Sequence, residues 1–79
     1  MKVKVRLFGT LGNKFPEHDP INGFEVEVQE DSTVGDLINM LDISKSKIGV
    51  VSINGKLETT LKKLRKGDFV QIFRPIFGG

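Results

Sequence analysis

The chain has 79 residues, near the lower limit for a self-sufficient hydrophobic core, so we expect one domain spanning residues 1–79. It contains no cysteine, which excludes disulfides and a thiol that could carry sulfur, and its single histidine, His18, argues against a metal site. Twelve basic and ten acidic residues give a net charge of +2, too balanced to favour a nucleic-acid partner. The sequence shows no signal or membrane-spanning segment, so we expect a cytoplasmic protein with no membrane partner.

The first thirty residues predict a hairpin of two half-buried strands. Apolar and charged residues alternate strictly from Lys2 to Phe8 and again from Phe24 to Gln29, which is typical of strands with one buried face. The outward face of the first strand is basic and that of the second is acidic, so antiparallel pairing would bring opposite charges together. Residues 9–22 between them are rich in turn residues, and His18 is expected to be only a polar loop residue.

A short helix is predicted after the hairpin, with a polar and irregular segment behind it. Its apolar residues follow helical spacing at Val34, Leu37, Ile38 and Leu41. Ser32 or Thr33 can cap the helix, and Asp36 adds negative charge to its first turn. Gly35 lowers helix propensity, so we expect a close packing contact at that position.

The second half of the chain predicts three strands, over residues 50–53, 56–58 and 69–73. The first two form a hairpin through Asn54 and Gly55, because both central positions of a type I′ turn need positive φ. Leu61 and Leu64 are expected to anchor the connection to the last strand. The apolar composition of the last strand favours a central position in the sheet, parallel to the first strand.

These elements predict an α+β fold, a ubiquitin-like β-grasp of order β-β-α-β-β-β with one helix packed on a mixed sheet. The predicted core lies under the helix and comprises Val3, Val5, Leu7, Val26, Val28, Leu37, Ile38, Leu41, Val51, Ile53, Val70 and Ile72.

The chain ends in a segment suited to reach into a narrow channel. Pro75 cannot donate a backbone hydrogen bond, so the sheet ladder should stop there. Gly78 and Gly79 close the sequence and have no Cβ, which predicts a thin, flexible Gly-Gly tail with a free carboxylate.

The motifs and their order resemble the MoaD/ThiS family of sulfur carriers, and the small subunit of molybdopterin synthase more than the thiamine sulfur carrier. The resemblance runs through Val5-Arg-Leu-Phe8 with Leu11, Thr33-Val34 with Asp36-Leu37, Ile53-Asn54-Gly55, Gly67-Asp68 with Val70, and Pro75 with the terminal Gly78-Gly79.

The resemblance implies a carrier that is not catalytic alone and serves molybdenum cofactor biosynthesis, with a thiamine-type sulfur carrier as an alternative. A ubiquitin-activating-type adenylating enzyme would join the Gly79 carboxylate to AMP from ATP, with Gly78 giving clearance. A sulfur donor protein would then convert Gly79 to a thiocarboxylate, and a large synthase subunit or another acceptor would receive the sulfur. The sequence has no Gly-rich phosphate loop, so ATP is expected to be bound by the partner and no cofactor to be held stably by this chain.

Residues next to the tail are candidates for partner binding. Phe69 and Phe73 are expected on the open face of the sheet, where neighbours partly cover them or where they form a docking patch. The full set of partner-binding candidates is Phe69, Phe73, Arg74, Pro75, Ile76 and Phe77.

Two other functional classes are compatible with the residues. A ubiquitin-like modifier would use the same adenylation and join Gly79 to lysines of other proteins, whereas a plain interaction module would not need the tail. The basic run Lys62, Lys63, Arg65 and Lys66 is either a solvated turn or a contact for an acidic partner.

Overall fold

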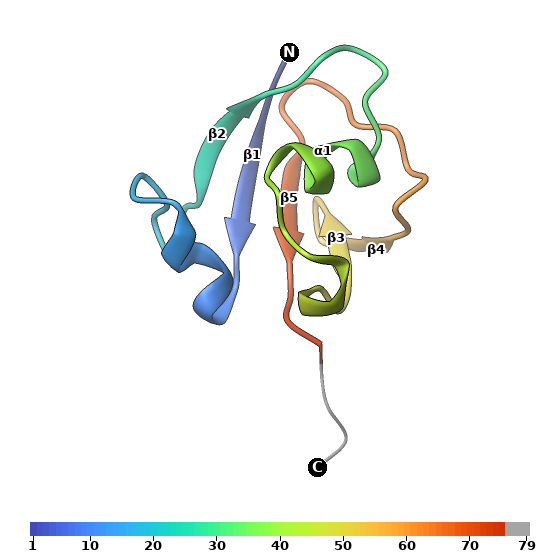
Figure 1. Ribbon diagram of the computed structural model, residues 1–79. Helices are drawn as coiled ribbons and strands as arrows, with labels where there is room; N and C mark the ends of the chain where they lie inside the picture. Colours follow the sequence, from blue (N-terminus) through green and yellow to red (C-terminus); the bar gives the residue numbers. More distant parts are fainter. Residues whose placement is uncertain (76–79) are drawn as a thin grey trace.

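The computed structural model, which describes residues 1–75, is a five-stranded mixed sheet with one helix across one face (Figure 1). The elements are β1 (Lys2–Leu7), η1 (Gly9–Lys14), β2 (Phe24–Glu27), α1 (Val34–Met40), η2 (Lys45–Lys47), β3 (Val51–Ile53), β4 (Lys56–Glu58) and β5 (Phe69–Ile72), where η denotes a 3-10 helix. The predicted β-grasp and the order of its helix and strands are confirmed, although β1, β2, β3 and β5 are each one or two residues shorter than predicted.

The strand order is β2-β1-β5-β3-β4, which places β5 at the centre of the sheet. The last strand runs parallel to the first, with Val5 opposite Val70, as its apolar composition predicted. In the β1–β2 hairpin, Lys2 lies opposite Glu27 and Lys4 opposite Glu25, so the exposed faces carry opposite charges. The central position fixes where the chain leaves the sheet.

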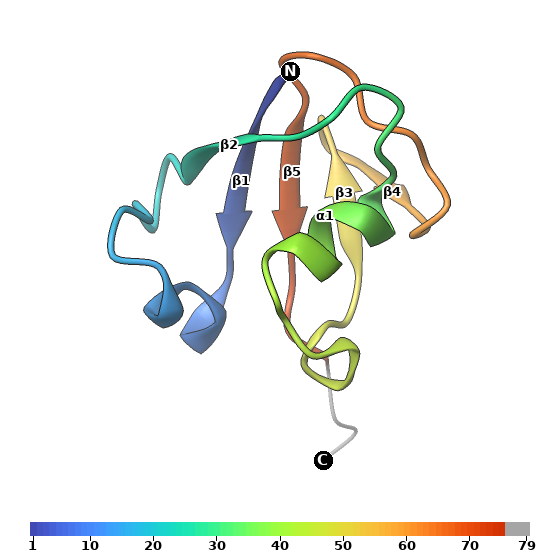
Figure 2. The same ribbon diagram turned by 45° about the horizontal axis from the view of Figure 1, so that its top comes forward.

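The core fills the space between the sheet and α1, which crosses one face (Figure 2). All twelve residues predicted for the core are buried. Four more join them, Leu11, Val34, Ile43 and Leu64. Leu61 is 83% exposed, so its predicted anchoring role is wrong, and of the two leucines only Leu64 is buried.

Local geometry explains the predicted turn at Asn54-Gly55 and the predicted close contact at Gly35. Asn54 and Gly55 have φ of 53° and 86°, as a type I′ hairpin requires. A Cβ on Gly35 would lie 3.3 Å from the carbonyl oxygen of Thr60, and the Gly35 N–H donates to that oxygen. The glycine therefore admits the β4–β5 connection against the first turn of α1.

Helix α1 begins at a capping box. The Thr33 hydroxyl accepts a hydrogen bond from the Asp36 N–H at 3.1 Å, and the Asp36 carboxylate accepts one from the Thr33 N–H at 2.9 Å. We expect Thr33→Ala to lower the free energy of unfolding by about 0.5–2 kcal/mol, measured by urea denaturation, because the Asp36 N–H loses the hydroxyl oxygen that caps it. Thr10→Ala, at an exposed position with no side-chain hydrogen bond, is the control, and equal midpoints for both variants would refute the capping role.

Candidate functional site: the tail root and the open sheet face

The chain leaves the sheet at the end of β5, through Phe73, Arg74 and Pro75, a segment that we call the tail root (Figures 1 and 2). Ile76, Phe77, Gly78 and Gly79 lie outside the described residues, so their predicted roles stay predictions.

Backbone hydrogen bonds hold the start of the tail root from both sides. The Phe8 N–H donates to the Ile72 carbonyl at 3.1 Å. On the other side, the Phe73 N–H donates to the Val50 carbonyl at 2.9 Å, and the Phe73 carbonyl accepts from the Gly49 N–H at 2.7 Å. Among the described residues this ladder ends at Phe73, two residues before the stop that was predicted at Pro75.

Two glycines make room for the next two residues of the tail root. A Cβ on Gly49 would lie 2.5 Å from the Arg74 carbonyl oxygen and 2.8 Å from the Pro75 Cα. A Cβ on Gly9, which has a φ of +63°, would lie 2.5 Å from the Arg74 Nε. Real Cβ atoms do not approach backbone this closely, so a side chain at Gly49 would displace the tail root. We call Gly9 and Gly49 the glycine collar.

An apolar patch lies on the open sheet face beside the tail root and consists of Phe8, Val50 and Phe73. The Phe8 and Phe73 rings stack with centroids 4.2 Å apart and planes 20° apart. The Arg6 guanidinium lies 4.3 Å from the Phe8 centroid, a cation–π distance. Val50 is 51% exposed. Together with Gly49 and the tail root it lines a hollow of about 410 Å³.

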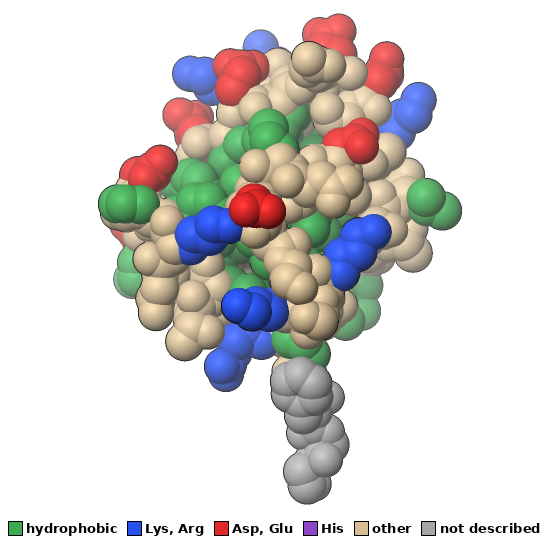
Figure 3. Space-filling view, in the orientation of Figure 1, with side chains coloured by type: hydrophobic (Ala, Val, Ile, Leu, Met, Phe, Trp, Pro, Cys, Tyr) green, Lys and Arg blue, Asp and Glu red, His purple; other side chains and the backbone are tan. Residues whose placement is uncertain are grey.

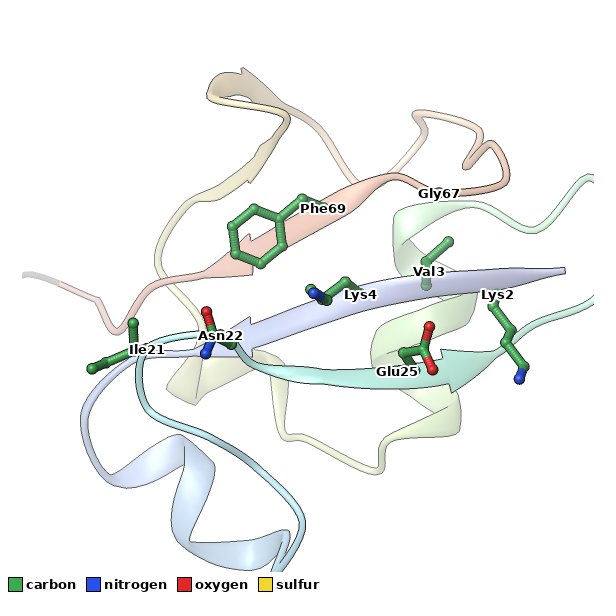
Figure 4. Close-up of a pocket in the computed structure, with 8 residues that line it drawn as sticks. All are labelled: Lys2, Val3, Lys4, Ile21, Asn22, Glu25, Gly67 and Phe69. Carbon is green, nitrogen blue, oxygen red and sulfur yellow. The ribbon is translucent and has the colours of Figure 1, made fainter.

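Phe69 lies apart from this patch. It is half-buried at the start of β5 and lines a second hollow of about 410 Å³ together with Lys4, Ile21 and Asn22 (Figure 4). The structure therefore brings Phe73, Arg74 and Pro75 together, whereas Phe69 lies at the other end of the strand. Both phenylalanines are partly covered by neighbours, and only Phe73 belongs to the tail root.

The loop beside Phe69 is held by an acidic side chain. The backbone N–H groups of Ile21 and Asn22 donate to the Asp19 Oδ1 at 2.7 and 3.1 Å. These bonds stabilise the charged carboxylate and lower the pKa of Asp19. Its hydrogen bonds are therefore present above its ordinary pKa and are lost as the pH falls through the lowered value.

His18 is more than a polar loop residue, in contrast to the prediction. Its Nε2 accepts a hydrogen bond from the Leu7 N–H at 2.9 Å. Leu7 follows Val5, the last residue of β1 that pairs with β2, so its N–H has no partner in that strand. A Cβ on Gly12 would lie 2.5 Å from the His18 Nδ1. The imidazole thus replaces a missing strand partner and joins the 9–22 loop to the sheet.

The basic run of residues 62–66 lies far from the tail root. The Lys62 carbonyl accepts a hydrogen bond from the Val34 N–H, and the Lys63 Nζ lies 4.0 Å from the Asp31 carboxylate. The run therefore borders the first turn of α1. It joins the start of β5, whereas the tail root follows the end of the same strand. A direct role of this run at the tail is therefore not supported.

Sequence reasoning missed the partners of Phe73 and the glycine collar. Phe8 is the outward residue that follows Leu7 in the alternating pattern, so that pattern could have placed it on the open face. Val50 and Gly49 carry no such signal, because their position depends on how β3 pairs with β5.

Comparison with known proteins gives one family and several similar structures. The family model described as Mut7-C ubiquitin matches residues 1–78. A search of curated protein sequences found no match. Among the described residues, no helix reaches the length and hydrophobicity needed to cross a lipid bilayer.

Three solved structures share the fold. Small archaeal modifier protein 1 of H. volcanii is 21% identical, with a TM-score of 0.73 over 95% of this chain and 98% of that chain. A putative molybdopterin converting factor, subunit 1, from Pyrococcus furiosus is 22% identical, with a TM-score of 0.73 over 96% of this chain and 99% of that chain. A complex of subunits 1 and 2 of molybdopterin-converting factor from Helicobacter pylori matches at 21% identity, with a TM-score of 0.62 over the whole of both chains.

Proposed function

The chain belongs to the Mut7-C ubiquitin family, and we propose on that premise that it is a sulfur carrier activated at its C-terminal carboxylate. The observation that carries the proposal is the held tail root: a central strand ends in backbone hydrogen bonds and a glycine collar, and four residues ending in Gly78-Gly79 follow. Such an arrangement gives the terminal carboxylate a defined starting point on a rigid domain.

The chemistry requires a partner enzyme that binds ATP. An oxygen of the Gly79 carboxylate attacks the α-phosphorus, and the bond to pyrophosphate breaks, leaving an acyl adenylate. Sulfur at the oxidation level of sulfide, supplied by a donor protein, then attacks the acyl carbon and displaces AMP. The product is a thiocarboxylate on Gly79, and Gly78 supplies clearance for the reacting group.

The acceptor that we propose is a large synthase subunit, and the pathway is molybdenum cofactor biosynthesis. Support comes from the shared fold with proteins described as molybdopterin converting factor subunit 1, one of them in complex with subunit 2. In our proposal the apolar patch meets such a partner, because aromatic side chains are enriched at the centres of interfaces.

A ubiquitin-like modifier is the second candidate, favoured by the shared fold with small archaeal modifier protein 1. Intact mass spectrometry of the native protein separates the two functions. A carrier gains the mass of one oxygen-to-sulfur exchange at the C-terminus, whereas a modifier forms isopeptide conjugates with lysines in denatured extract. A terminus that shows neither change would contradict both.

We expect Phe73→Ala to weaken binding of the adenylating enzyme or synthase partner by more than about 1 kcal/mol, as for an interface anchor. Its ring stacks on Phe8 at the edge of the tail root, so the loss removes contact area where the partner must approach. Isothermal titration calorimetry measures the change. Leu61→Ala removes an 83% exposed leucine elsewhere and is the control, and equal affinities for the two variants would exclude Phe73 as an anchor.

A further inference from the structure

The end of the molecule around the tail root is strongly basic. The segments that meet there, residues 9–15, 42–49 and 73–75, contain four cations, Lys14, Lys45, Lys47 and Arg74, and one carboxylate, Asp42. Their net charge of +3 exceeds the +2 of the whole chain. Figure 3 shows Lys and Arg side chains gathered at this end and most acidic side chains towards the opposite end.

One of the four cations is already used by the fold. The Lys14 Nζ donates to the carbonyls of Leu41 and Asp42 at 3.3 and 2.6 Å and lies 3.6 Å from the Asp42 carboxylate. Within residues 1–75, no carboxylate forms a salt bridge with Lys45, Lys47 or Arg74. Three cations therefore lack an acidic partner in the described part of the chain.

Two of these three cations line a groove between η1 and η2. The groove has a volume of about 410 Å³, and its lining combines Lys47 and Arg74 with the hydroxyls of Thr10 and Ser46 and the apolar side chains of Leu11 and Pro75. We call it the basic groove. Because Arg74 and Pro75 belong to both the groove and the tail root, a group bound in the groove lies at a fixed place relative to the departing chain.

We propose that the basic groove docks an acidic segment of the enzyme that activates Gly79, a peptide whose Asp or Glu carboxylates bind Lys47 and Arg74. This inference rests on the proposed function and names the chemistry of the partner. A guanidinium and a carboxylate form charge-assisted, often bidentate hydrogen bonds, and the apolar lining accommodates the methylene groups of a glutamate. Binding there would orient the tail root before the carboxylate reaches ATP.

The lining of the basic groove favours an acidic peptide over a nucleic acid as the occupant. A single-strand site combines a cationic groove that follows the backbone with aromatic side chains on which bases stack. Here the cations are few, and none of the phenylalanines within residues 1–75 lines the groove. A short acidic peptide matches the size and the mixed lining.

The test compares two charge reversals in the full chain with its purified adenylating enzyme. Lys47→Glu changes an exposed groove residue, and Lys66→Glu changes an exposed residue just before the start of β5 by the same charge. ATP–pyrophosphate exchange gives KM for the carrier and kcat at several salt concentrations. We expect Lys47→Glu to raise KM about tenfold at low salt, with kcat unchanged, because exposed charges act mainly on association. Lys66→Glu is expected to leave KM near the wild-type value.

The outcomes separate this inference from the proposed function. If the wild-type chain supports no exchange, the proposed function fails. If the wild type is active but Lys47→Glu has the same KM and salt dependence as Lys66→Glu, the basic groove has no docking role. Tight binding of a single-stranded RNA oligonucleotide that Lys47→Glu abolishes, with activation unchanged, would also overturn it. Recovery of KM when a glutamate of the enzyme is changed to lysine would identify the docked segment.

Discussion

Deletion of Gly79 is expected to abolish adenylate formation and to leave stability unchanged. The deletion moves the terminal carboxylate to Gly78, back along the chain by one residue, which spans about 3.3–3.6 Å when extended. Catalysis tolerates misplacement of reacting atoms by only about 1 Å, so the rate should fall by at least about 100-fold. Gly79 comes four residues after Pro75, so the described core and the tail root stay intact.

Pyrophosphate release from ATP measures the first step, and urea denaturation confirms that the fold is unchanged. A chain with one added C-terminal glycine is the matched control for length, because it misplaces the carboxylate by the same amount in the opposite direction. Gly78→Val should also impair activation, through bulk at the narrow point and loss of access to positive φ. Wild-type rates from the Gly79 deletion would refute the sulfur-carrier and modifier proposals together.

Replacement of Leu37 by alanine is expected to cost about 2–5 kcal/mol of unfolding free energy. Leu37 lies on the face of α1 that meets the sheet and is fully buried, so truncation leaves a cavity in the core. Small domains are stabilised by only about 5–15 kcal/mol, so this one change removes a large share.

Urea denaturation of the wild type and Leu37→Ala measures the difference in unfolding free energy, with one slope of free energy against urea concentration fitted to both proteins. Leu61→Ala is the control, because this leucine is 83% exposed and an exposed substitution should change stability by about 0.5 kcal/mol or less. Similar midpoints for Leu37→Ala and Leu61→Ala would mean that α1 does not cover the core.

The sequence predicted those parts of the fold that depend on local periodicity. Alternation in β1 and β2 identified their buried faces, and the Asn54-Gly55 pair identified the β3–β4 turn. Leu61 and Leu64 show where this reasoning stops. Both are isolated apolar residues in a turn-rich connection, and only the tertiary path, in which the Leu64 N–H donates to Ser32, decides which one is buried.

The candidate site was predicted only in part, for the same reason. Phe73, Arg74 and Pro75 could be located because they follow an apolar strand and precede the glycines. Gly49 could not, since its function depends on the pairing of β3 with β5, which brings residues more than twenty positions apart into contact. His18 likewise gains its role only when the 9–22 loop folds back onto β1.

The pairing of the first strand with the last has a consequence for folding kinetics. The β1–β2 and β3–β4 hairpins can close locally, but β5 joins them only when residues 69–72 meet residues 4–7, with most of the chain looped between. Contacts so distant in sequence slow folding, and they make the central strand a late and cooperative addition. The backbone bonds of Phe73 to residues 49 and 50 belong to that same step. A partly folded chain would therefore lack a fixed tail root, and an activating enzyme that recognises it would select molecules that have finished folding.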